Sequence, residues 1–318
     1  MQKILFILIF LLLATFINTN AQSIISVANT EGSERAPIIV SYDENGEQII
    51  FVVYELNSRI AISKSIDGGQ NWSFYGEIIS RNGKLPSATI EDGFLYVSFI
   101  STDNHSIYCY KYDIFKSFNE NELSYENQMS LGLNIVYRQS ILVKDGDIYL
   151  GYARTITFNS TVIRNFCISK NFYELDEKFI FEHPQKTFLR IDGADKEGGV
   201  YFTYNTAFID GYDQISVVGD ESNDNWQQKY FSSTQTNKGG PSISASYKND
   251  WAICYQDENS VKCYYKLKNG TTKEETITIN GNVSSIDMDV TGEYIYITQR
   301  TKVQAKAEAK AKEKKEYP

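Results

Sequence analysis

Short apolar segments with alternating side chains recur along most of this chain, and polar turns separate them. Residues 94–99 (FLYVSF) and 294–297 (YIYI) are two of the clearest examples. A period of two residues predicts strands with one buried face. The turns at residues 91–93 (EDG) and 144–146 (KDG) contain the residue types that tight hairpins prefer. The pattern therefore predicts a series of antiparallel hairpins.

The hairpin pattern repeats six times, at intervals of 44 to 54 residues. The repeats open at Pro37, Pro86, Ser140, Asp192, Pro241 and Ser285. Repeats of about 40–50 residues with four strands each are typical of propeller blades. The sequence thus predicts an all-β fold, a six-bladed β-propeller over residues 22–300, with a β-sandwich or solenoid as the alternative. The sixth repeat shows two clear strands, and we expect residues 23–27 to supply its outer strand.

The two ends of the chain differ from the repeats. Residues 1–21 combine Lys3, an apolar run over residues 4–16 and small residues before Ala21, as signal peptides do. That run is shorter than the ~20 residues a spanning helix needs. We expect cleavage near Ala21, a secreted, periplasmic or cell-surface protein and no later membrane span; a retained single-pass anchor is the alternative. Residues 301–318 form a charged low-complexity tail that alternates Ala with charge.

The formal net charge is −9, and because the tail is rich in lysine, the repeats are more acidic than this total. An acidic body argues against nucleic acid as a partner, since phosphate binding needs concentrated Lys and Arg. Four cysteines in an exported chain raise the question of disulfides. Cys254 and Cys263 flank one predicted turn symmetrically, which favours a cross-strand disulfide or two facing thiols. Cys109 and Cys167 lie in corresponding strands of two repeats and favour separate buried thiols.

One turn carries a more specific motif. Residues 65–72 read SIDGGQNW directly after a predicted strand. The pattern S-x-D-x-G-x-x-W, formed by Ser65, Asp67, Gly69 and Trp72, resembles the Asp-box (BNR repeat) of sialidase-like β-propellers. Asp67 is expected to accept hydrogen bonds from its own turn, and the glycines to adopt positive φ. The resemblance implies a propeller of sialidase-like type and places this turn away from the active site.

A second point of resemblance concerns ligand binding. Sialidases open their first blade with an F/Y-R-I-P motif whose arginine binds the sialic acid carboxylate, and residues 33–37 (SERAP) keep the arginine, Arg35, and the proline. Guanidinium groups suit bidentate binding of carboxylates. Other repeats have basic residues at corresponding positions: Lys84, Arg138, Arg190 and Lys238. In a propeller these positions predict a cationic mouth of the central channel, which would focus an anionic ligand.

The catalytic residues of a sialidase are harder to assign. The resemblance implies a catalytic Asp and a second arginine in the first blade, where Glu55 and Arg59 are the candidates. The family's nucleophile is a Tyr activated by a Glu; Tyr137, Tyr204, Tyr212 and Glu197 are candidates among 23 tyrosines. Only two histidines are present, so neither a histidine-rich metal site nor a Ser-His-Asp triad is expected, and no cofactor is expected.

These observations predict an exported sialidase-like propeller that binds a glycan or another anionic ligand at the channel mouth, without full sialidase catalysis. Two alternatives remain open. The first is an exo-glycosidase of the sialidase type, with Arg35 holding the carboxylate and Glu55 as an unusual acid. The second is a protein-binding scaffold. The oligomeric state has no sequence signal.

Overall fold

The computed structural model describes residues 27, 34–44, 47–120, 126–132, 134–158, 161–172, 178–182, 186–196, 199–208, 213–220, 226–234, 242–246, 249–257, 260–267, 272–278, 283–291 and 294–301. Nearly all of them lie in strands, which form five four-stranded sheets and one two-stranded sheet. A short 3-10 helix, η1 (Phe118–Glu120), follows the second sheet's third strand. The predicted signal peptide, the tail apart from Thr301, and the expected strand at residues 23–27 apart from Val27 lie outside the described residues.

Each sequence repeat forms one sheet, here called a blade, whose strands are neighbours in chain order. Blade one comprises β1 (Glu34–Glu44), β2 (Glu47–Leu56), β3 (Arg59–Ser65) and β4 (Ser73–Ile78). Blade two comprises β5 (Gly83–Glu91), β6 (Phe94–Ser101), β7 (Ser106–Asp113) and β8 (Glu126–Ser130). Blade three comprises β9 (Ile135–Lys144), β10 (Asp147–Phe158), β11 (Thr161–Lys170) and β12 (Lys178–Glu182).

The second half of the chain continues the series. Blade four comprises β13 (Lys186–Lys196), β14 (Gly199–Phe208), β15 (Asp213–Asp220) and β16 (Trp226–Thr234). Blade five comprises β17 (Ser242–Ser246), β18 (Asn249–Asp257), β19 (Ser260–Leu267) and β20 (Thr272–Thr278). Blade six comprises β21 (Val283–Thr291) and β22 (Tyr294–Thr301).

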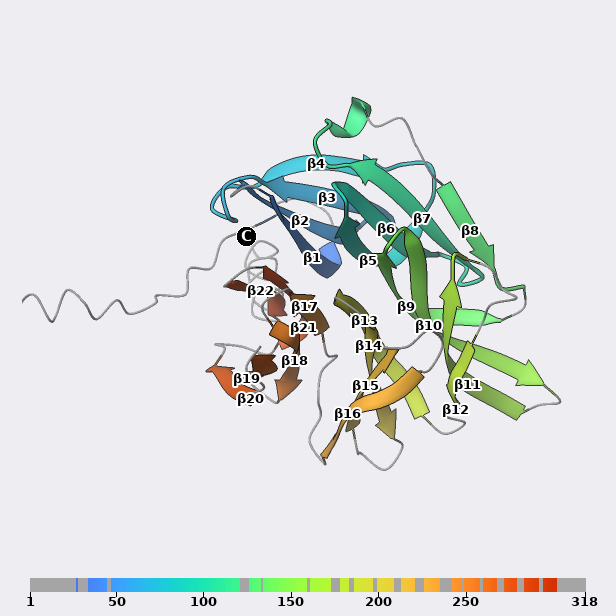
Figure 1. Ribbon diagram of the computed structural model, residues 1–318. Helices are drawn as coiled ribbons and strands as arrows, with labels where there is room; N and C mark the ends of the chain where they lie inside the picture. The colour runs from blue at the N-terminus through green and yellow to red at the C-terminus, as the bar shows by residue number, and fades with distance from the viewer. Residues whose placement is uncertain are drawn as a thin grey trace, which may run out of the picture.

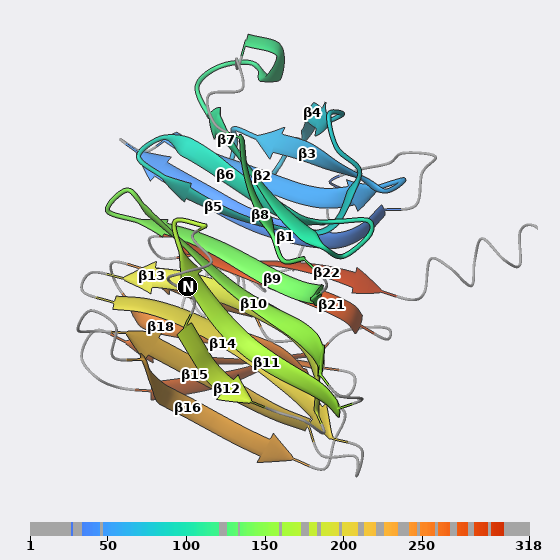
Figure 2. The same ribbon diagram turned by 90° about the vertical axis from the view of Figure 1, so that its right-hand side faces the viewer.

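The blades are arranged radially around an axis (Figure 1). The first strand of each blade is the inner one, and these strands contact one another in the order β1, β5, β9, β13, β17, β21, with β21 also contacting β1. In Figure 2, blade three faces the viewer and β21 and β22 lie below β1. Between β5 and β9, the hydroxyl oxygens of Ser87 and Ser140 are 3.2 Å apart.

The hairpin turns adopt the geometry that their residues predict. Asp92 and Gly93 have φ values of 50° and 75°, and Asp145 and Gly146 have values of 53° and 80°. Two consecutive residues with positive φ match the type I′ turn, whose twist suits the two strands that it joins. Asp-Gly therefore closes the first hairpin of blades two and three, as predicted from the sequence.

Apolar side chains between adjacent blades form the core. One cluster joins blades one and two, a second joins blades two and three, and a third joins blades three and four. Aromatic rings fill much of this volume: Phe99 is fully buried and stacks on Tyr110 with the ring centroids 5.6 Å apart. The high aromatic content of the chain is thus explained by packing between blades.

The cysteines occupy the places expected for them. Cys254 and Cys263 are directly opposite each other in β18 and β19, and a disulfide joins them. Cys109 and Cys167 are separate, buried thiols. Burial raises the pKa of the Cys109 thiol far above its usual value, so this side chain is an inert packing group.

Candidate functional site

Four predicted ligand-binding residues lie at one end of the ring. Arg35, Lys84, Arg138 and Arg190 are within the first five residues of the inner strands β1, β5, β9 and β13. These strands are neighbours around the axis and all begin at the same end of the ring. We call this end the mouth face and the opposite end the rear face.

The inner strands are irregular at the mouth face. The pairing register shifts near the start of β1, β5, β9, β13 and β21, each time adding a residue to the inner strand. In β1 and β5 the bulge includes Ala36 and Leu85, whose φ values are 47° and 52°. Non-glycine residues in this region are strained by ~1–3 kcal/mol, and such strain concentrates at functional sites. Bulges also redirect the neighbouring side chains. The bulges adjoin the four basic positions.

The basic side chains differ in their contacts. Arg35 is exposed. The Lys84 ammonium donates to the carbonyl oxygen of Thr102 at 3.4 Å, and Arg138 Nη1 donates to the carbonyl oxygen of Tyr137 at 2.9 Å. Arg190 is placed by its backbone in β13, and Lys238 lies outside the described residues.

Arg59 does not join this group. It begins β3, two strands outward from the inner strand, and its guanidinium forms an ion pair with Glu77 at 3.0 Å. Sequence reasoning missed Arg81, which follows β4 on the same face and lies 5.4 Å from the centroid of the Tyr108 ring. It also missed Arg154, which is 6% exposed in β10 opposite Val136. Neither residue occupies the position within the repeat that identified the basic residues of the inner strands.

The candidate catalytic residues occupy different environments. Glu55 is half-buried in β2, directly across the strand pair from Arg35. Tyr204 is 2% exposed, and its ring stacks on Phe166 with the centroids 4.8 Å apart. Tyr137 packs against the same apolar cluster between blades three and four. Packing between blades three and four is enough to explain why Tyr137 and Tyr204 occupy these positions. Glu197 and Tyr212 lie outside the described residues.

The turn of residues 65–72 is at the rear face, because β3 runs from the mouth face to this turn. Asp67 Oδ1 accepts hydrogen bonds from the Ser65 hydroxyl and from the Asn71 N–H, both at 2.8 Å. These donors, with the Asn71 side-chain amide, lower the pKa of Asp67 to about 2. The Trp72 indole N–H donates to the carbonyl oxygen of Gly69 at 2.9 Å. These hydrogen bonds close the turn, which lies at the opposite end of the ring from the basic residues of the mouth face.

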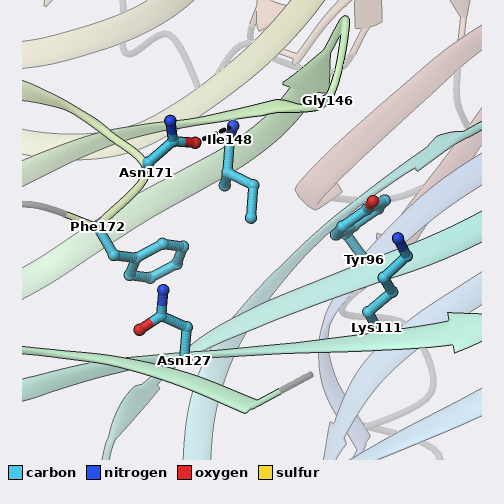
Figure 3. A pocket seen from close by; sticks show the side chains of 7 residues that line it. All are labelled: Tyr96, Lys111, Asn127, Gly146, Ile148, Asn171 and Phe172. Atoms are coloured by element: carbon cyan, nitrogen blue, oxygen red, sulfur yellow. Dashed lines mark hydrogen bonds between the residues drawn. The ribbon is translucent and has the colours of Figure 1, made fainter. Parts of the chain in front are cut away.

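The rear face also has a pocket, between blades two and three (Figure 3). Its volume is about 490 Å³, and it is lined by Tyr96, Lys111, Asn127, Gly146, Ile148, Asn171 and Phe172. Asn171 fixes one wall, because its Oδ1 accepts the Ile148 N–H at 2.8 Å and its amide nitrogen donates to Asp147 at 2.9 Å. Sequence reasoning did not select these residues, since the pocket forms only when two blades meet.

Among the described residues, no group of three or more His, Cys, Asp or Glu side chains could hold a metal ion. No helix in the described part of the chain is long and apolar enough to cross a membrane.

Comparison with known proteins supports the fold. No family model matches the sequence, and no curated protein matches it. A fucose-binding lectin of Aleuria aurantia with a six-bladed β-propeller superposes with a TM-score of 0.53 at 14% identity, covering 84% of this chain and 88% of the lectin. A Hadza microbial sialidase gives a TM-score of 0.54 at 12% identity, covering 86% of this chain and 66% of the sialidase. The protein YjhT gives 0.51 at 11% identity, with 86% and 93% covered.

The six sheets and these likenesses define the class of protein: the chain is a six-bladed β-propeller, as the repeats predicted. At such low identities the likenesses establish the fold and leave the activity to be argued from the chain's own residues.

Proposed function

We propose that this protein is an exported, sialidase-like propeller that binds a glycan or another anionic ligand at the mouth face, without full sialidase catalysis. The observation that carries this proposal is the placement of Arg35, Lys84, Arg138 and Arg190 near the starts of four neighbouring inner strands. These basic groups gather at one face of a protein that is acidic as a whole, with a net charge of −9. Such a contrast attracts an anion to the axis.

Arg35 is the central residue of the proposed site. It is exposed, it starts the first inner strand, and the strained Ala36 follows it. A guanidinium can hold a carboxylate through two parallel hydrogen bonds, and hydrogen bonds to charged groups contribute about 1.5–3 kcal/mol each. Acidic sugars such as sialic acid and uronic acids combine that carboxylate with the hydroxyl groups of a glycan. The fold is shared with a fucose-recognising lectin and with a sialidase, which supports a carbohydrate as the ligand.

We further propose that the turn of residues 65–72 is an Asp-box. Support comes from the hydrogen bonds of Asp67, from the positive φ values of Gly68 and Gly69, and from the packing of Trp72 against a buried cluster. Its rear-face position agrees with a purely structural role.

The second candidate function is an exo-glycosidase of the sialidase type. One observation favours it: Glu55 lies opposite Arg35 in the β1–β2 pair, so a carboxyl group is close to the proposed anion-binding arginine. Two carboxyl groups or a carboxyl and an activated tyrosine are needed for glycoside hydrolysis. Glu55 is one carboxylate, and the tyrosine candidates Tyr137 and Tyr204 are engaged in packing between blades.

The test combines binding with hydrolysis. Purified protein is titrated with sialyl and uronic acid oligosaccharides at low and high salt. We expect binding that weakens with salt and falls at least tenfold in Arg35→Ala. Arg59→Ala is the matched control, because Arg59 is on the same face but paired with Glu77, and its affinity should stay within twofold of the parent.

Two results would contradict the proposal. Equal losses in the two variants would show a general charge effect rather than a site at Arg35. Release of the fluorophore from a methylumbelliferyl sialoside, abolished by Glu55→Gln, would establish the glycosidase instead. The export prediction has its own measurement: the mature protein should begin near Gln22 by mass spectrometry.

A further inference from the structure

The rear-face pocket is formed by two blades and is remote from the mouth face. Blade two supplies Tyr96 from β6, Lys111 from β7 and Asn127 from β8, and blade three supplies the remaining walls. Figure 3 shows Tyr96 and Lys111 on one side, and Asn171, Ile148 and Phe172 on the other. Its volume of about 490 Å³ falls within the 300–1,000 Å³ typical of small-molecule sites.

The pocket occupies the place in blade three that a tryptophan fills in blade one. In blade one, Lys64 pairs with Phe51 and its ammonium lies 5.4 Å from the ring centroid. In blade three, Lys170 pairs with Tyr149 at the same distance from its ring centroid. Ile50 and Ile148 directly precede these two aromatic residues, so they occupy equivalent positions in blades one and three.

Trp72 packs against the cluster that contains Ile50, on the side toward the preceding blade. Trp72 directly precedes β4, whereas the residue before β12 is Glu177. Blade three has no tryptophan to place over Ile148, and the pocket adjoins Ile148 on the side toward blade two. The pocket is thus the counterpart of the Trp72 niche.

The walls combine flat apolar surfaces with hydrogen-bonding groups. Tyr96 and Phe172 are both 7% exposed, so the fold holds their rings firmly and only a small part of each ring reaches the pocket. The Lys111 ammonium is 4.0 Å from the centroid of the Phe94 ring and 5.1 Å from that of Tyr96. Asn127 of blade two and Asn171 of blade three add amide groups to the lining. Aromatic rings contact the C–H face of a sugar, while amide and ammonium groups bond its hydroxyl oxygens.

The charges around the pocket offset one another. Among the described residues of the lining, Lys111 carries the positive charge. Glu91 lies at the rim, with Oε2 3.4 Å from the Gly146 nitrogen, and Asp147 is paired with Lys170 at 2.6 Å. An anionic ligand would meet the Glu91 carboxylate as well as the Lys111 ammonium, so an uncharged ligand is favoured.

We propose that this pocket is a second binding site, specific for a neutral saccharide. The site takes one or two pyranose rings, with C–H groups against the accessible parts of Tyr96 or Phe172 and hydroxyl groups toward Asn127, Asn171 and Lys111. It is independent of the proposed mouth-face site, because its residues belong to the opposite end of blades two and three. A protein with both sites could bind two branches of one glycan or two separate glycan chains.

The test uses the neutral methyl glycosides of glucose, galactose, mannose, fucose and N-acetylglucosamine, measured one at a time by saturation-transfer NMR and calorimetry. The blocking variant is Asn127→Trp, which adds a large ring on the pocket side of β8. The matched control is Gln128→Trp, because the next side chain on a strand points to the other face and Gln128 is exposed. Lys111→Met is a second variant that removes the donor while keeping most of the side-chain volume.

We expect at least one glycoside to bind, with an affinity reduced at least tenfold in Asn127→Trp and in Lys111→Met. Gln128→Trp and Arg35→Ala should leave that affinity within twofold, and raising the salt concentration should have little effect. Failure of all five glycosides to bind would overturn the inference, as would binding that Asn127→Trp and Lys111→Met leave unchanged. Loss in Arg35→Ala alone would move the sugar to the mouth face and equally refute the pocket.

Discussion

The ring of Phe202 lies against two glycines, and this contact offers a quantitative test of how the blades pack. Phe202 is fully buried between blades three and four. A Cβ added at Gly151 of blade three would lie 2.7 Å from Phe202 Cδ1, and one added at Gly193 would lie 2.7 Å from Cε1. Carbon atoms in contact are normally about 3.5–4.0 Å apart. Both additions would meet the same Cδ1–Cε1 edge of a fully buried ring, so the ring would have to shift within a packed core.

We therefore expect Gly151→Ala to destabilise the fold. Overpacking of a core costs about 1–3 kcal/mol, and the lower entropy of the unfolded alanine chain offsets about 0.4–1 kcal/mol of that. The net loss should be about 1–2 kcal/mol. For a chain of this size that corresponds to a decrease in Tm of at most ~2–4 °C per kcal/mol lost. Urea unfolding followed by tryptophan fluorescence measures the free energy directly.

A double-mutant cycle separates the steric clash from other effects of the substitution. Phe202→Leu shortens the side chain, so Gly151→Ala should cost at least about 1 kcal/mol less in that background. Phe99→Leu is the matched control, because Phe99 is also fully buried but lies between blades one and two. Its coupling with Gly151→Ala should stay below about 0.5 kcal/mol. Equal coupling in both backgrounds, or a Gly151→Ala protein as stable as the parent, would refute the packing argument.

Three other predictions concern charge and covalent structure. The depressed pKa of Asp67, about 2, means that its turn stabilises the fold above pH ~4 and loses this contribution as pH falls toward 2. Asp67→Asn should accordingly reduce the urea midpoint more at pH 6 than at pH 3, and a constant difference would disprove the link. Burial raises the pKa of Glu91, so its stabilising protonated form is lost as pH rises. Glu91→Gln should thus increase stability at pH 7 relative to pH 4, and a decrease at pH 7 would contradict this. The Cys254–Cys263 disulfide spans nine residues, and replacing both cysteines by serine should cost about 2.6 kcal/mol by loop entropy; unchanged unfolding would exclude that contribution.

The sequence predicts those features that depend on local chemistry and on a repeated register. Asp92-Gly93 and Asp145-Gly146 specify their turns because both positions need positive φ. The six repeats specify the blade number, since each has the hairpins of one sheet. Cys254 and Cys263 are symmetrical about a turn, which places them opposite each other.

Features that arise where two distant segments meet are not predicted in the same way. Arg59 is indistinguishable in sequence from a ligand-binding arginine, and only the β3–β4 pairing shows that Glu77 is its partner. In β1 and β5 the bulge lies between a basic residue and a proline, but the bulges of β9, β13 and β21 lack this pattern. Predicting the rear-face pocket would require knowing that Ile148 is equivalent to Ile50 and how blade two packs against blade three. Local periodicity gives neither.

The contact between β21 and β1 has a consequence for how the molecule loses its structure. A linear array of repeats has terminal units held on one flank only, from which melting can begin and spread. Here every blade touches two others, so opening any one of them exposes two apolar flanks at once. Detaching a single unit is correspondingly costly, and denaturation should be concerted over the whole circle.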